Sequence, residues 1–246
     1  MRKGKKWVVV FDFDGTFTPK GKSLFVMIDE RALPSEGLKA QQEIYAHFIH
    51  KALAGKLTAS EDKSWLLKSI KNYLRYGLTR EKARTALSDA SLRRGVRECL
   101  EMLRRAKVPV AIISYGIAPL IELVLDENGI TVPGPLIRHI YAAKFLVETK
   151  AGRFVGYDRQ SLVLQSTKGE WSRHFADACG VPYRNILAVG DSGGDKKLGY
   201  LKENRLAIAK NPEQAAELAP YMGTVAVTED FGPVTAWLRS KLGPIK

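Results

Sequence analysis

Residues 7–16 have the sequence WVVVFDFDGT. The first five form a short, continuously apolar run, which predicts a fully buried strand of a parallel sheet. Asp12 ends this run, and Asp14 follows after one intervening residue. Residues two apart on an extended chain point to the same side, so we expect the two carboxyl groups to face one site. Paired acids at a strand end suit a nucleophile, a proton donor and a metal, although a turn can also contain two aspartates without such a role.

Other apolar runs predict further strands of the same sheet. They occupy residues 108–113, 186–189, 205–209 and 224–227, and the last two are the weaker. Helical patterns lie between and beside them, at about 91–106, 117–128, 168–179, 194–201 and 212–219. Strands that alternate with helices predict an α/β fold, a Rossmann-like parallel sheet core covered by helices on both faces. Ligands of such sheets bind outside the carboxyl ends of the strands.

Residues 20–88 break this alternation. They contain amphipathic helical patterns and, apart from an ambiguous apolar run at 24–28, no strand pattern. Thr58 and Glu61 have the spacing of a capping box, and Gly77 suits the end of the helix that it opens. We therefore expect a helical cap formed by 20–88.

The rest of the chain is then the core. Residues 1–19 and 89–246 would form one catalytic domain around the inserted cap. Within this core, residues 145–157 predict a β-hairpin with Gly152 in its turn.

A second acidic stretch, GDSGGD, occupies residues 190–195 and follows the strand at 186–189. Carboxylate oxygens in a loop bent by glycines suit a hard divalent cation, and Mg²⁺ commonly takes one or two carboxylates with water and a substrate phosphate. Asp12 and Asp191 together would supply such a pair. An ordinary strand-to-helix turn, capped by Asp191 or Asp195, is the alternative.

Two further positions suit a phosphate. Ser114 follows the apolar run at 108–113 and precedes Tyr115 and Gly116, where a hydroxyl and backbone N–H groups can hold an anion; a plain helix N-cap is the alternative. Lys168 lies in the first turn of a predicted helix, where the capping-box spacing of Thr167 and Glu170 places it. The helix dipole disfavours a lysine there, which indicates a nearby anion, although most such lysines are simply solvated.

Taken together, D-x-D-G-T at 12–16 and G-D-S-G-G-D at 190–195, with a hydroxyl and a lysine between them, resemble the haloacid dehalogenase superfamily of phosphotransferases. The resemblance implies a phosphatase that works through an aspartyl phosphate, with Asp12 as nucleophile and Asp14 as general acid and base. It also implies Mg²⁺ as the cofactor, bound by the Asp12 side chain, the Asp14 carbonyl and Asp191, with Ser192 and Asp195 in supporting roles. The phosphoryl group would be held by Thr16, Ser114, Tyr115, Gly116 and Lys168.

The details of the motifs favour a phosphatase over other members of the superfamily. A dehalogenase would lack Asp14, and a P-type ATPase would have a lysine between the acid and the threonine, which is absent here. The insert and both motifs resemble the pyrimidine 5′-nucleotidase and phosphoserine phosphatase groups, and we favour a nucleoside 5′-monophosphate substrate, with phosphoserine or another small metabolite as the alternative. Aromatic residues of the insert would stack on a base or simply form its core (Tyr45, Phe48, Trp65, Tyr73 and Tyr76). The carboxylate expected to read the base is missing around 64–74, where the candidate positions are basic or apolar.

Composition limits the partners. The chain has 246 residues and a net charge of +13, which favours anionic ligands. No zinc-finger, RNA-recognition or helix-turn-helix pattern accompanies the basic residues, so we expect a phosphorylated small molecule rather than nucleic acid. A non-catalytic anion-binding module on the same fold is the alternative. No run is apolar enough to span a bilayer, the basic cluster at 2–6 lacks the features of a signal peptide, and two widely separated cysteines suit the cytoplasm.

Overall fold

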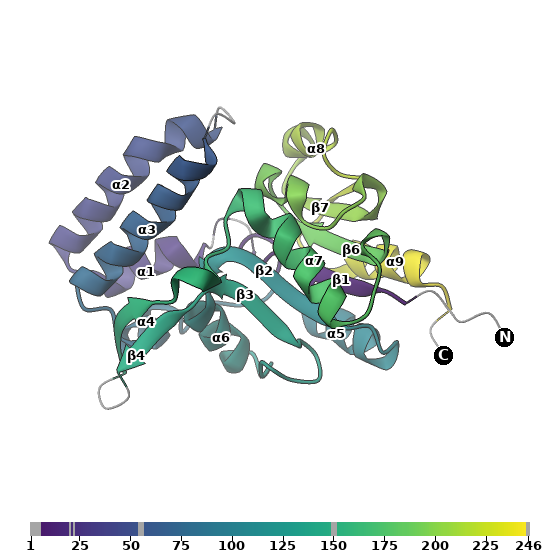
Figure 1. The fold of residues 1–246 in the computed structure, drawn as a ribbon, viewed down its shortest axis with the longest axis horizontal. Helices are drawn as coiled ribbons and strands as arrows, with labels where there is room; N and C mark the ends of the chain where they lie inside the picture. Colours follow the sequence, from purple (N-terminus) through teal and green to yellow (C-terminus); the bar gives the residue numbers. More distant parts are fainter. Residues whose placement is uncertain (1–5, 20, 22, 54–56, 149–151, 245–246) are drawn as a thin grey trace.

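In the computed structural model of this protein, six parallel strands form one sheet in the order β3-β2-β1-β6-β7-β8. The structure describes residues 6–19, 21, 23–53, 57–148 and 152–244 (Figure 1). The predicted α/β fold is confirmed. The strands are β1 (Val8–Phe11), β2 (Val110–Ile117), β3 (His139–Ala143), β6 (Ile186–Gly190), β7 (Arg205–Ala209) and β8 (Thr224–Val227).

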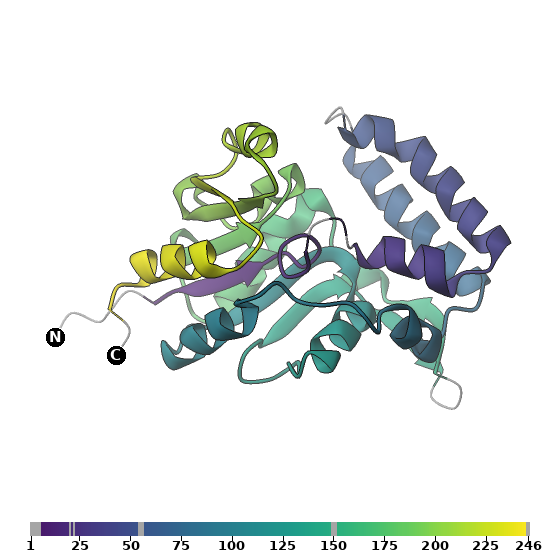
Figure 2. The ribbon, with the colours of Figure 1, turned by 180° about the vertical axis from the view of Figure 1, so that it is seen from behind.

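Helices cover both faces of this sheet, because alternate residues of its buried strands point to opposite sides. Val9 and Phe11 of β1 pack into a hydrophobic core with three helices of the face seen in Figure 2, whereas Val8 and Val10 pack with α7 on the face seen in Figure 1. The three helices are α5 (Val96–Arg105), α6 (Ala118–Glu127) and α9 (Gly232–Leu242); α7 is Lys168–Ala178, and α8, beside β7 and β8, is Pro212–Leu218.

Several element bounds differ from those expected. β2 continues to Ile117 instead of ending at residue 113, and β3 was not anticipated. Residues 193–197 form a short 3-10 helix, η4 (Gly193–Lys197), in place of an α-helix over 194–201. The helix expected from residue 91 begins at Val96, because the preceding Gly95 has a φ of +88°, outside the helical range.

The described part of the insert is mainly helical, with an isolated β-bridge between Thr79 and Arg153. Its helices are α1 (Leu24–Ala32), α2 (Ser35–Leu53), α3 (Ala59–Arg75) and α4 (Arg80–Ala86), so the ambiguous run at 24–28 begins a helix. The capping box of Thr58 and Glu61 forms at the start of α3, and Gly77 follows its end with a φ of +64°. α2 and α3 lie side by side, and the group stands beside the carboxyl ends of β1 and β2 (Figures 1 and 2).

The insert and the sheet share a continuous interior. Leu24, Ile70 and Tyr73 of the insert belong to the same cluster of buried side chains as Phe11 of β1. The hairpin formed by β4 (Phe145–Glu148) and β5 (Arg153–Tyr157) also joins the two, since Phe154 donates its backbone N–H to the Leu78 carbonyl at 3.3 Å. We therefore keep the division into a core (1–19 and 89–246) and a cap (20–88) as a proposal.

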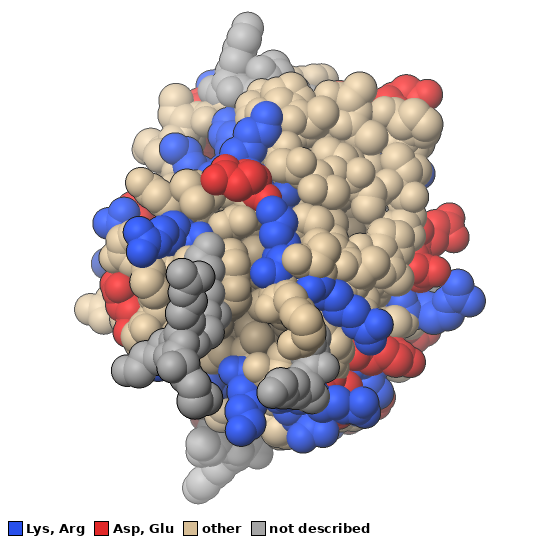
Figure 3. Space-filling model, turned by 90° about the vertical axis from the view of Figure 1, so that its right-hand side faces the viewer, with Lys and Arg blue, Asp and Glu red and all other residues tan. Residues whose placement is uncertain are grey.

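The surface is basic without being uniformly so. On the face shown in Figure 3, lysine and arginine side chains are interspersed with acidic and uncharged ones. The basic cluster at 2–6 lies outside the described residues except for Lys6. None of the helices in the described part of the chain has the length and apolar character needed to cross a membrane.

Candidate active site

The site lies where β1, β2 and β6 end. Phe11 is in register with Ile112 on one side and with Val189 on the other. Asp12 is one residue beyond this level, whereas Ser114 and Asp191 are two residues beyond it. Three segments that are far apart in sequence thus bring polar side chains to one edge of the sheet, as the carboxyl ends of parallel strands do in folds of this kind.

Lys168 joins two of these carboxylates. Its ammonium group lies 2.9 Å from Oδ2 of Asp12 and 2.7 Å from Oδ1 of Asp195, and its side chain is 2% exposed. Burial alone would lower the pKa of Lys168, but the two carboxylates raise it above its ordinary value. Burial raises the pKa of Asp12 to about 6, against the lowering effect of Lys168. One lysine therefore faces two buried carboxylates and compensates only one of their charges.

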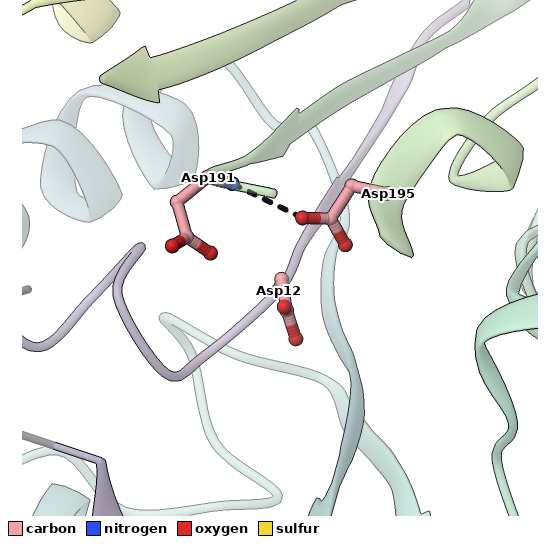
Figure 4. A group of neighbouring side chains, drawn as sticks. All are labelled: Asp12, Asp191 and Asp195. Atoms are coloured by element: carbon pink, nitrogen blue, oxygen red, sulfur yellow. Dashed lines mark hydrogen bonds between the residues drawn. The ribbon is translucent and has the colours of Figure 1, made fainter. Parts of the chain in front are cut away.

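The loop after β6 adds a third carboxylate. Carboxyl oxygens of Asp12, Asp191 and Asp195 lie within 4.8 Å of one another, and Figure 4 shows the three side chains around a common space. Asp195 accepts hydrogen bonds through Oδ2 from the backbone N–H groups of Asp191 and Ser192, each at 3.1 Å, and from the Ser192 hydroxyl at 3.0 Å. Asp195 thus shapes the loop that carries Asp191.

Two glycines permit this close approach. A Cβ on Gly15 would lie 2.2 Å from Oδ2 of Asp191, and Gly15 has a φ of +72°. A Cβ on Gly190 would lie 2.4 Å from Cγ of Asp195. Both contacts are shorter than non-bonded atoms allow, so the backbone itself forms part of the wall around the carboxylates.

Asp14 faces the start of the insert. Its Oδ1 accepts a hydrogen bond from the backbone N–H of Leu24 at 3.2 Å, and the Ser23 hydroxyl lies 3.5 Å from its Oδ2. Burial raises the pKa of Asp14 to about 7. A carboxyl group with a pKa near neutrality can both give and take a proton at physiological pH.

The residues expected to hold a phosphate differ in whether their polar groups already have hydrogen-bond partners. Thr16 is buried, and its hydroxyl has no hydrogen-bond partner among the described residues. Ser114 is 2% exposed, and its Oγ accepts the backbone N–H of Gly116 at 3.1 Å, so this N–H group already has a partner. The phenol of Tyr115 donates to the backbone carbonyl of Asp62 at 2.9 Å. The capping box expected at Thr167 is absent, because its Oγ1 instead accepts the backbone N–H of Leu164 at 3.0 Å.

Sequence reasoning missed two residues at this site. Asp62 is a buried cap carboxylate whose Oδ2 accepts the backbone N–H of Gln165 at 3.0 Å, across 103 residues of sequence. Arg93 is buried next to the first acidic motif (residues 12–16), and its Nη2 donates to the Gly15 carbonyl at 2.9 Å. Both residues lie in or next to predicted helices and carry no motif, so nothing in the sequence marks their long-range contacts.

The aromatic residues of the insert mainly pack against each other. Tyr73 is fully buried, and its hydroxyl donates to Oδ1 of Asp29 at 2.7 Å. Phe48 stacks on Trp65 at a centroid distance of 5.7 Å, and Tyr45 meets the same indole edge-on. At least Tyr73 and Phe48 are therefore part of the core of the insert, as the simpler interpretation of these aromatics expected.

The donor set suits a hard divalent cation. Oδ1 of Asp12 is buried and has no hydrogen-bond partner among the described residues, beside a loop that brings in Asp191. Three carboxylates against one lysine leave an excess of negative charge, which a bound cation would compensate. Asp12 and Asp191 are the better candidates for ligands, because both oxygens of Asp195 are occupied by Lys168 and by its own loop.

Comparison with known proteins identifies the family of this chain. The family model of haloacid dehalogenase-like hydrolases matches residues 9–199. The chain belongs to this family. The family expected from the two acidic motifs is therefore confirmed, and the match includes both of them.

The curated relatives are phosphoserine phosphatases. One from Archaeoglobus fulgidus is 24% identical over 213 residues, which cover 85% of this chain and 54% of that protein. Another, from Streptomyces coelicolor, is 26% identical over 145 residues, which cover 56% of this chain and 33% of that protein. The matches thus span about half and one third of the length of these relatives.

Solved structures share the fold. A phosphoserine phosphatase with a phospho-aspartyl intermediate analogue has a TM-score of 0.68 at 20% identity, covering 95% of this chain and 99% of that one. Cytosolic 5′-nucleotidase IIIB bound to cytidine has a TM-score of 0.71 at 17% identity, covering 96% of this chain and 85% of that one. Both groups that the sequence resembles therefore have the same arrangement of elements as this chain.

Proposed function

We propose that this protein is a Mg²⁺-dependent phosphomonoester hydrolase that works through an aspartyl phosphate on Asp12. The observation that carries the proposal is the state of the Asp12 carboxyl group. One oxygen is paired with Lys168, and the other is buried without a donor among the described residues, beside Asp191. A carboxylate held in this way suits attack on phosphorus, because a cationic side chain fixes its position next to the place where phosphoryl charge must be neutralised.

The residues divide the chemistry into two displacements. Asp12 attacks the phosphorus atom, the bond to the substrate oxygen breaks, and Asp14 gives that oxygen a proton. A water molecule then attacks the phosphorus of the aspartyl phosphate, Asp14 takes its proton, and the bond to Asp12 breaks to release phosphate. The pKa of Asp14, raised to about 7 by burial, supports its use as acid in the first step and base in the second.

Charge on the phosphoryl group needs compensation in both steps. Lys168 supplies one positive charge, and Ser114 and Thr16 offer hydroxyl donors at the same edge of the sheet. Asp12, Asp191 and the Asp14 carbonyl are the proposed ligands of Mg²⁺. When bound, Mg²⁺ supplies electrostatic stabilisation of the phosphoryl oxygens. Asp195 and Ser192 position Asp191 and Lys168.

The proposed substrate is a phosphorylated small molecule. Nucleoside 5′-monophosphates and phosphoserine are the two classes to compare, since the fold is shared with a nucleotidase and with phosphoserine phosphatases. Packing of Tyr73 and Phe48 inside the insert weakens the argument from base stacking, and the curated relatives favour the phosphoserine side. The cytoplasm is the proposed compartment, because Cys99 and Cys179 are both free thiols.

The test is phosphate release with and without Mg²⁺ from both substrate classes and from 4-nitrophenyl phosphate. Asp12→Asn is expected to abolish turnover and to keep the fold, because Lys168 retains Asp195 as a partner. Glu217→Gln, which removes an exposed charge on α8, is the matched control and should retain full activity. Activity that survives in a folded Asp12→Asn variant, or that does not depend on the metal, would contradict the proposal.

A further inference from the structure

A connected group of aromatic and cationic side chains lies outside the active site, around the start of β7. Tyr200 and Tyr221 are 58% and 44% exposed. The guanidinium group of Arg205 donates to the backbone carbonyls of both, to Tyr200 at 2.9 Å and to Tyr221 at 3.3 Å. One planar group thus holds together the two segments that carry these tyrosines, while much of each tyrosine side chain is open to solvent.

The group extends on both sides of this pair. On one side the Tyr200 ring lies 6.4 Å from that of Tyr183, and the guanidinium of Arg173 on α7 lies 4.4 Å from the centre of the Tyr183 ring. On the other side the Lys196 ammonium lies 5.6 Å from the centre of the Tyr221 ring. We call these residues the tyrosine band, which consists of Arg173, Tyr183, Lys196, Tyr200, Arg205 and Tyr221.

The tyrosine band lies in the half of the sheet away from the insert. Apart from Arg173, its residues belong to segments that flank or begin β6, β7 and β8, whereas the insert stands beside β1 and β2 (Figure 1). The residues come from separate stretches of sequence that only the fold brings together. No local sequence motif therefore marks this surface.

The charge around the tyrosine band is positive. Residues 196–210 include five lysine or arginine residues and one acidic residue. Within the described part of the chain, neither Arg173 nor Lys196 forms an ion pair, so the protein itself does not neutralise these charges. This surface contributes to the net charge of +13, most of which the proposed active site does not use.

Cations interspersed with exposed aromatic rings suit a single-stranded nucleic acid. The cations attract its phosphates, and its unpaired bases stack on aromatic side chains, whereas a double helix keeps its bases stacked within itself. An acidic protein segment would use the cations but would have no need of the rings. Binding to a membrane surface would draw on a larger apolar face than a few tyrosines provide.

We propose that the tyrosine band binds a segment of single-stranded nucleic acid. Bases stack on Tyr200 and Tyr221, which Arg205 holds at a fixed separation. Phosphates lie beside Arg173 and Lys196. This activity is separate from phosphoester hydrolysis and does not depend on the proposed function.

The probe is a fluorescent oligothymidylate about 15 nucleotides long, within the range that one single-strand-binding surface covers. It has no terminal phosphate, so it is not a phosphomonoester substrate. Fluorescence anisotropy should give a Kd of about 1–100 μM near physiological salt. The logarithm of the binding constant should fall with the logarithm of salt concentration with a slope of about −1.4 or steeper, as expected for contact with two or more phosphates of a single strand.

Variants of the rings test stacking. Tyr200→Ala and Tyr221→Ala should each weaken binding by about fivefold or more. Tyr45→Ala removes a tyrosine of α2 that is 52% exposed and is the matched control, with binding within about twofold of wild type. Hydrolysis of 4-nitrophenyl phosphate should be the same in Tyr200→Ala as in the wild type. A thermal melt identifies any variant that does not fold, and Tyr200→Leu, which keeps apolar bulk without a ring, then replaces the alanine variant.

Variants of the charges test the phosphate contacts. Arg173→Gln should make the salt dependence shallower by about 0.7, the loss of one phosphate contact. Lys39→Gln, at an exposed position on α2, should leave the slope unchanged. Asp12→Asn should bind the probe as the wild type does, because the active site is not the binding surface.

Several results would overturn the inference. The first is absence of oligothymidylate binding at low salt, and the second is equal binding by the wild type and both tyrosine variants, which would assign the interaction to charge alone. A loss of binding in Asp12→Asn would place the probe in the active site instead. Binding to phosphatidylserine vesicles without binding to the oligonucleotide would assign the surface to a membrane. None of these results bears on phosphate release, which tests the proposed function separately.

Discussion

The ammonium group of Lys168 lies 2.9 Å from Oδ2 of Asp12, although Lys168 begins α7 and Asp12 follows β1. Both side chains are at least 90% buried, and the lysine also contacts Asp195 at 2.7 Å. Buried charges of this kind are costly unless each has a partner, so the three side chains depend on one another. Among the described residues, Lys168 is the only cationic side chain that forms an ion pair with Asp12. The residue that stabilises the buried carboxylates is therefore also the one proposed to hold the phosphoryl group.

Lys168→Met should therefore be harmful in two ways. It leaves two buried carboxylates without their cation, and we expect a loss of about 3–5 kcal/mol in the free energy of unfolding together with loss of turnover. Urea unfolding in the presence of a chelator measures the first effect. The double variant Lys168→Met/Asp12→Asn should recover part of the stability because one of the unpaired charges is gone. Lys210→Met, at an exposed position, is the control. Equal stability of Lys168→Met and Lys210→Met would show that Asp12 and Asp195 do not depend on Lys168 for their stability.

Gly15→Ala should weaken metal binding more than it weakens the fold. The new Cβ would lie 2.2 Å from Oδ2 of Asp191, so that carboxylate must move. Gly77→Ala is a matched control, because Gly77 has a similar φ of +64° but no atom within 4 Å of the added Cβ. Each variant should lose about 1 kcal/mol for its backbone conformation. Only Gly15→Ala should lose the rise in melting temperature that Mg²⁺ produces in the wild type, and an intact rise would show that Asp191 tolerates the Cβ.

The sequence was most informative where chemistry is local. Residues 7–16 predicted the buried strand and the acid pair, and the unfavourable position of Lys168 at a helix start predicted a nearby anion, which the structure shows to be Asp12 and Asp195. Asp62 could not be found in this way. An acid in the first turn of a helix has an ordinary explanation in the helix dipole, and its bond to Gln165 depends on how the cap meets the core.

Arg93 was hidden for the same reason. It fell within the helix expected over 91–106, whereas its backbone N–H donates to the Phe17 carbonyl at 2.7 Å and holds the chain outside α5. The end of β2 was also missed, because Ser114 was expected to terminate a strand that in fact continues to Ile117. Such boundaries are set by tertiary hydrogen bonds, which periodicity does not encode.

Arg93→Met should destabilise the loop that carries the first acidic motif, residues 12–16. Arg93 donates to the Gly15 carbonyl at 2.9 Å and to the Thr228 carbonyl at 3.3 Å, so its loss leaves two acceptors without their donor. We expect a cost of about 1–3 kcal/mol in the free energy of unfolding. Arg94→Met is the adjacent control. Arg94 forms an exposed ion pair with Asp230 that solvent screens, so its removal should change the free energy of unfolding much less. Denaturant unfolding of both variants measures the difference, and similar costs would show that the buried contacts add nothing.

Asp29 gives the cap a pH-dependent stability. Burial raises its pKa from an ordinary 3.8 to about 7, against the lowering effect of the Tyr73 hydroxyl, which donates to it at 2.7 Å. Between about pH 4 and pH 7 the unfolded chain has released this proton while the folded protein still holds it, so the contribution to stability falls as the pH rises through this window. Above pH 7 the folded protein must bury the charge.

Asp29→Asn keeps an oxygen for the Tyr73 hydroxyl but cannot ionise. The variant should therefore be more stable than the wild type at pH 8, by about 1–2 kcal/mol after allowance for partial exposure, and this advantage should shrink as the pH falls towards 5. Urea unfolding of both proteins at several pH values, with a chelator present so that metal binding does not contribute, measures the gap. Glu43→Gln, at an exposed position on α2, should show no comparable pH-dependent gap. A gap for Asp29→Asn that is constant from pH 5 to pH 8 would show that Asp29 is ionised in the folded protein throughout this range.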